Sequence, residues 1–199
     1  SDGGVEVDPA VLWASVVAAG QQAIAASGNP TLTAIGLGNQ GETIVAWDRA
    51  TGRTQGPAIV WQDRRSSVVC DRLAEHGPRL AQITGLELDP YFVAPKMVWL
   101  RERIDDGLAL TTTDAWLLHQ MCGAFVTDVA TAGRTLLLDL ETGTWSDEAS
   151  AIFDIDSTTL PQVVFPKLVT HPEFRGFLQR RLDKLVLREE GVEAAQLAH

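Results

Sequence analysis

Two carboxylates, Glu42 and Asp63, stand at the ends of neighbouring short apolar segments, and Trp61 lies close to the second. Paired carboxylates can serve acid–base chemistry, or they can bind hydroxyl groups, because an ionised carboxylate accepts several hydrogen bonds. An aromatic ring against the carbon face of a polyol, with carboxylate and amide groups on its hydroxyls, would form a sugar site. The alternative is that Trp61 is part of the core and Asp63 pairs with Arg64 or Arg65.

A glycine pattern offers a different chemistry. Residues 36–41 fit the pattern G-x-G-x-x-G, and Asp63 follows at about the distance of a ribose ligand in a dinucleotide site. Such a site requires a helix directly after the third glycine, so that the helix N-terminus faces the pyrophosphate. Residues 42–48 are instead rich in strand-forming side chains. A nicotinamide-dependent oxidoreductase is therefore the less favoured function.

The elements that would position these residues are predicted from apolar periodicity and from turn signals. Asp8-Pro9 predicts the start of a helix that ends at Gly28, and residues 1–7 read as a loop. Short strands are expected at 34–37, 44–47, 58–61 and 135–140, with a turn at 48–52 and an extended segment at 157–166. Further helices are expected at 65–73, 79–83, 95–104, 114–121 and 147–153, and one or two more in the tail from 171.

Composition narrows the class of protein. The chain has 199 residues, of which 45% are hydrophobic, so it can bury a core. Its formal net charge of -10 argues against nonspecific nucleic-acid binding. Cys70 and Cys122 are expected to be buried reduced thiols, and no metal-ligand spacing is present. We see no signal peptide and no apolar run near the ~18–20 residues of a membrane helix, so a cytoplasmic protein without membrane contact is expected.

Several segments together resemble the glycerol kinase branch of the FGGY carbohydrate kinases. The first two of these segments are NQGETIVAWDRATG at 39–52 and AIVWQDRR at 58–65. The resemblance continues in order, from residue 5 to about residue 164. Its other segments are VEVDPAVLWASV (5–16), TGLELDPYFVAPKMVWL (84–100), TTDAWLLHQMCG (112–123) and VTDVATAGRTLLLDLETGTWSDE (126–148).

This resemblance implies an α/β fold, an actin-like ATPase domain of the ribonuclease H type, with a mixed sheet and flanking helices. It also implies transfer of the γ-phosphoryl group of ATP, with Mg2+, to a hydroxyl of a polyol or sugar. By the same resemblance Glu42 and Tyr91 would bind substrate hydroxyls and Trp61 would pack on the carbon face. Gln40 would support the loop, and Asp63 would lie near or behind the site.

The sequence also departs from that family. Gly41 stands where glycerol kinases have an arginine that grips the polyol, so a longer polyol or a sugar is expected to fit better than glycerol. The phosphate-binding hairpin, the segment with the catalytic aspartate and the second, ATP-binding domain are not found in these 199 residues. We therefore expect an incomplete substrate-side domain at 1–166, a helical tail at 167–199 and no catalytic residue.

Two further expectations follow from this incompleteness. The chain alone should be inactive as a kinase, and a non-catalytic polyol-binding or regulatory remnant of such a kinase is the alternative function. Apolar surface left exposed by a missing domain would favour association into a homo-oligomer.

Overall fold

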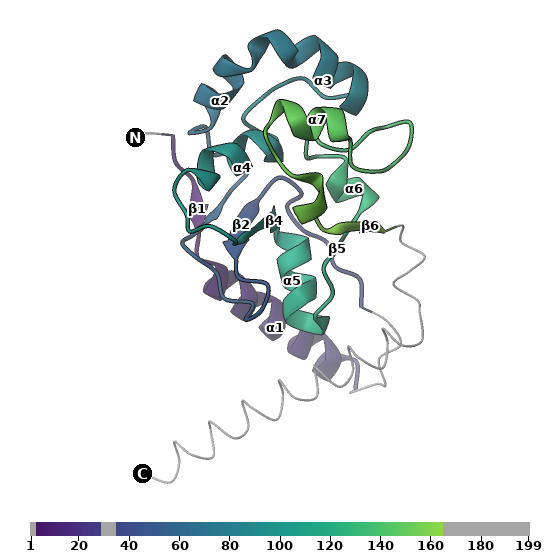
Figure 1. The fold of residues 1–199 in the computed structure, drawn as a ribbon. Coiled ribbons are helices and arrows are strands. Elements are labelled where there is room, and N and C mark those ends of the chain that lie inside the picture. The colour runs from purple at the N-terminus through teal and green to yellow at the C-terminus, as the bar shows by residue number, and fades with distance from the viewer. Residues whose placement is uncertain (1–2, 29–34, 165–199) are drawn as a thin grey trace.

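The computed structural model describes residues 3–28 and 35–164, which form a layered α/β structure (Figure 1). The predicted tail helices, the expected boundary at 166, the Asn29-Pro30 turn and the first residue of the 34–37 segment lie outside this range. The elements in chain order are β1 Glu6–Val7, α1 Pro9–Ala26, β2 Ile44–Trp47, β3 Ala58–Ile59, α2 Ser67–Arg72, the 3-10 turn Ala74–His76, α3 Gly77–Thr84, α4 Val93–Arg101, β4 Ala109–Thr112, α5 Thr113–Cys122, β5 Val126–Asp128, α6 Val129–Ala132, α7 Asp147–Ile152, the 3-10 turn Ser157–Thr159 and β6 Gln162–Val164.

Strand β2 is the centre of the main sheet, whose strand order is β1-β3-β2-β4 with antiparallel pairing throughout. All four residues of β2 are fully buried. Alternate side chains of a strand point to opposite faces, so Val45 and Trp47 pack with α1 and α5 while Ile44 and Ala46 pack with α3 and α4. Figure 1 shows these helices on the two sides of the sheet. A second sheet pairs β5 with β6 in parallel, which gives the mixed α/β architecture that was expected.

Helix α1 confirms the start signal read at Asp8-Pro9. The Asp8 side chain accepts a hydrogen bond of 2.8 Å from the amide of Ala10, and Pro9 takes the first helical position. The expectation that no apolar run is long enough for a membrane helix is wrong. The 18 residues of α1 carry no charged side chain, and by length and composition alone this helix could cross a membrane. In the structure Leu12, Trp13 and Val16 pack against the sheet instead.

Three predicted strands need correction. Residues 35–37 form no strand. The segment predicted at 58–61 is a strand only over β3, because the amide of Asp63 donates a hydrogen bond to the carbonyl of Val60 and so forms a turn. The 135–140 strand is wrong apart from an isolated bridge at Leu138. Leu136 there has a left-handed backbone with φ of 65° and is fully buried, as is Leu137. Burying both leucines in one core requires a turn rather than an extended chain.

A buried ion pair fastens β1 to the segment that follows β3. The Asp63 carboxylate is 1% exposed and accepts hydrogen bonds from the amide of Val5 at 2.8 Å and from the Arg65 guanidinium at 2.6 to 3.1 Å. This pairing is one part of the alternative that the sequence left open, with Arg65 rather than Arg64 as the partner of Asp63. Burial by itself would raise the pKa of Asp63, but the hydrogen bonds from Arg65 and Val5 outweigh it and hold the pKa below its usual 3.8.

Replacing Asp63 with asparagine should destabilise the protein by about 3 kcal/mol, because it leaves the Arg65 charge without its buried partner. The native pKa is depressed, so the contribution of Asp63 is complete above pH ~4 and is lost as the pH falls through the native pKa. Urea unfolding of the wild type and of Asp63→Asn at pH 7 and pH 3 measures this, with exposed Asp106→Asn as the control. An unchanged difference between the two pH values would contradict the assignment.

Candidate functional site

Glu42 lies at the end of a loop that is hydrogen-bonded to two helices. The Asn39 side chain donates to Thr113 at 3.4 Å and accepts from the Thr131 hydroxyl at 3.3 Å, which joins the loop to α5 and α6. The Gln40 carbonyl accepts from the amide of Thr43, and its side chain accepts from the Thr43 hydroxyl, both at 3.0 Å. The loop therefore presents Glu42 in one position directly before β2.

Three of the five predicted site residues come together. The rings of Trp61 and Tyr91 lie 5.6 Å apart at an angle of 59°, and both are partly exposed, so Trp61 is not a core residue. Glu42 is connected to Tyr91 through Arg134, whose guanidinium bonds the carboxylate and lies 5.7 Å from the tyrosine ring. Gln40 is exposed and its side chain accepts from Thr43 within the same loop, whereas Asp63 is buried against Arg65.

Arg134 was missed by sequence reasoning. Its Nε donates to Oε1 of Glu42 at 2.6 Å, across 92 residues of sequence. The hydrogen bond to Glu42 raises the pKa of Arg134 most, burial opposes it, and Tyr91 raises it further, so this side chain stays charged. The arginine was part of a quoted motif, but nothing in its spacing indicated contact with Glu42. The contact is seen only in the structure, where α6 packs against the loop and the residues that follow α6 come close to Glu42.

Lys96 was also missed. It is 1% exposed, and its ammonium donates to the backbone carbonyls of Tyr91 and, at 2.8 Å, of Phe92. Burial lowers the pKa of Lys96 to about 8, although Glu42, Asp63 and Asp89 act in the opposite direction. A buried cation beneath the site therefore fixes the backbone that carries Tyr91. A lysine inside the apolar 93–100 segment was the available signal.

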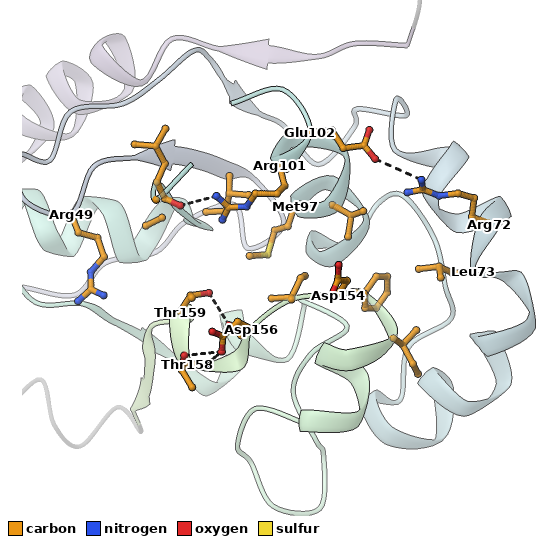
Figure 2. Close-up of a pocket in the computed structure, with 18 residues that line it drawn as sticks. Arg49, Arg72, Leu73, Met97, Arg101, Glu102, Asp154, Asp156, Thr158 and Thr159 are labelled. Atoms are coloured by element: carbon orange, nitrogen blue, oxygen red, sulfur yellow. Dashed lines mark hydrogen bonds and ion pairs between the residues drawn. The ribbon is translucent and has the colours of Figure 1, made fainter. Parts of the chain in front are cut away.

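A cavity lies elsewhere in the described part of the chain (Figure 2). It has a volume of about 1030 Å³ and lies between α4, β4 and the segment 152–159. Met97, Leu110 and Phe153 contribute apolar walls, and charged side chains of both signs, including Arg101 and Asp154, line the rest. None of the predicted site residues lines this cavity. Its size alone does not connect it with the chemistry read from the motifs, so Glu42, Trp61, Tyr91 and Arg134 remain the candidate site.

Comparison with known proteins shows the class of domain to which this fold belongs. Residues 1–186 match the FGGY family of carbohydrate kinases, N-terminal domain, and the chain belongs to that family. It is 41% identical over 189 residues to a glycerol kinase of Janthinobacterium sp. (strain Marseille), covering 87% of this chain and 38% of that protein. A glycerol kinase of Deinococcus radiodurans is 42% identical over 174 residues, covering 81% and 35%.

Solved structures agree with the sequence relatives. A Plasmodium falciparum glycerol kinase with ADP superposes with a TM-score of 0.70 at 30% identity, covering 81% of this chain and 35% of that one. A xylulose kinase from Brucella ovis gives 0.73 at 27% identity, with the same coverage. The expected actin-like kinase fold is confirmed. The chain spans little more than a third of the length of these relatives.

Replacing Lys96 with methionine should change how stability depends on pH. The native pKa of about 8 lies below the usual 10.5, so between these values the unfolded chain binds more protons than the folded chain. Wild-type stability should therefore rise relative to that of Lys96→Met as the pH increases from about 8 to 10.5. Urea unfolding at pH 7.5, 9 and 10.5 measures this difference, since the other titrating groups are common to both proteins. Parallel profiles would show that Lys96 titrates normally.

Proposed function

We propose that this chain is the substrate-side part of an ATP-dependent kinase that phosphorylates a hydroxyl of a polyol or sugar, in the manner of glycerol kinases. The observation that carries the proposal is the grouping of Glu42, Trp61 and Tyr91 at one site in a chain that belongs to this kinase family. A cytoplasmic location is part of the proposal, because the reaction consumes ATP. A non-catalytic polyol-binding remnant would use the same site without phosphoryl transfer.

Each residue has a role that its chemistry supports. Glu42 keeps one carboxylate oxygen to which no described residue donates, and this oxygen can accept from a substrate hydroxyl. The partly exposed rings of Trp61 and Tyr91 offer faces for the carbon skeleton, and the tyrosine hydroxyl adds a hydrogen-bonding group. Asp63 and Gln40 support the two segments that deliver these groups. Fixing a hydroxyl in one orientation is the main contribution such a wall makes to phosphoryl transfer.

The substrate is proposed to be longer than glycerol. Gly41 places no side chain beside Glu42, and the two atoms nearest to a β-carbon built there both belong to Arg134. The side chain next to this position is therefore Arg134, 42% exposed, rather than a side chain of residue 41 itself.

ATP and Mg2+ are the cofactors that this reaction would need, and the described residues do not fit the nucleotide. The glycine pattern at 36–41 runs into a turn and β2, so no helix N-terminus follows it to receive phosphate groups. The helix that a dinucleotide site needs is missing at the same place, which leaves the oxidoreductase alternative without structural support.

A thermal-shift screen of glycerol, erythritol, xylitol and common sugars tests the site, because a ligand that binds only the folded state raises its melting temperature. We expect at least one polyol to raise the melting temperature of the wild type and to leave that of Glu42→Gln unchanged. Glu148→Gln is the matched control, since Glu148 also pairs with an arginine but lies on the surface. An equal shift in Glu42→Gln would contradict the assigned site.

The 199-residue chain by itself is expected not to phosphorylate any of these polyols. The reason is that its described residues offer no cradle for the triphosphate. The check is a coupled assay of ADP release with each polyol that gives a thermal shift, alongside the complete gene product. Polyol-dependent ADP release by the purified chain would refute this prediction.

A further inference from the structure

Two arginine–glutamate pairs in this protein have different geometry. Arg79 and Glu148 bond at two points, with Nε to Oε1 at 2.7 Å and a terminal nitrogen to Oε2 at 2.6 Å. Both side chains are about half exposed. This pair uses both carboxylate oxygens, which is the usual fork geometry of a structural surface pair.

The pair of Arg134 and Glu42 uses one contact only. Nε of Arg134 bonds Oε1 of Glu42 at 2.6 Å, and no described residue donates to the other oxygen. Glu42 is 10% exposed, whereas the Arg134 side chain is 42% exposed. A guanidinium has five N–H donors, so several remain near Glu42 and open to solvent. The pair therefore offers an acceptor and donors side by side.

The aromatic residues around Arg134 place this pair within the candidate site. The guanidinium carbon of Arg134 lies 5.7 Å from the centre of the Tyr91 ring and 5.0 Å from that of Phe92. On the other side is Gly41, where a built β-carbon would lie 3.5 Å from Cγ of Arg134. An alanine would fit this space, but a long side chain would compete with Arg134 for it. The glycine thus allows Arg134, which follows α6, to reach Glu42.

We propose that Arg134 binds the substrate and determines which polyols are accepted. Together with Glu42 it would hydrogen-bond two hydroxyls on adjacent carbons. One hydroxyl donates to the free oxygen of Glu42, and its neighbour accepts from an N–H of Arg134. A vicinal diol presents its two oxygens side by side after fixing one C–C torsion, whereas hydroxyls on alternate carbons reach the same spacing only after two torsions are fixed, at a greater cost in conformational entropy. This inference rests on the proposed function, because it assigns the substrate class of the same site.

The experiment compares two isomers, propane-1,2-diol and propane-1,3-diol, which differ only in hydroxyl spacing. Dissociation constants are measured by ligand-observed NMR for the wild type, Arg134→Gln, Arg134→Lys and the surface control Arg79→Gln. The wild type and Arg79→Gln should prefer the 1,2-isomer. Arg134→Gln should bind that isomer about tenfold more weakly, as expected for loss of a hydrogen bond from a charged group, with little change for the 1,3-isomer. Arg134→Lys should fall between them, because it keeps the charge and loses the fork.

Unliganded melting temperatures show whether each variant is folded, and Arg134→Lys carries the test if Arg134→Gln unfolds. A folded Arg134 variant that keeps the wild-type preference, or loses both isomers equally, overturns this proposal and leaves the proposed function standing. A wild type that binds neither diol and no polyol of the thermal-shift screen overturns both. A wild type that binds polyols without preferring the 1,2-isomer overturns only the role assigned to Arg134.

Discussion

The buried carboxylate of Asp63 is the constraint on which the arrangement of the site depends. It is 1% exposed and is compensated by the Arg65 guanidinium and by the amide of Val5, so the strand before α1 and the segment after β3 are bound to one point. Trp61 lies two residues before that point. A charge held this deeply is tolerated only with its partners in place, so the ion pair fixes the backbone that carries the tryptophan.

Sequence reasoning succeeded where the signal was local. Strand β2 is a run of uncharged residues between a glycine-containing loop and a turn, and helix α1 follows an aspartate cap and a proline, so both elements were predicted. Strands β1, β4 and β5 were missed, because each is two to four residues long and exists through pairing with a distant partner. The segment around Leu136 has the composition of a strand, but the core imposes a left-handed turn there.

The site follows the same division. Glu42, Trp61 and Tyr91 stand in motifs whose residue types suggest polyol binding, and the structure gathers them. Arg134 and Lys96 escaped notice because an arginine after a short helix and a lysine within an apolar helix carry no local sign of their partners. Their significance comes from packing, which brings Arg134 to Glu42 and places Lys96 under the carbonyls of Tyr91 and Phe92.

The contact between Glu42 and Arg134 closes a loop of 92 residues. An unfolded chain must lose much conformational entropy to bring two such distant groups together, so it cannot offer them as a preformed pair. The candidate site therefore forms only after β2, α4, α5 and α6 have assembled. A polyol bound by both side chains would link two segments far apart in sequence, and would slow hydrogen exchange well away from the site.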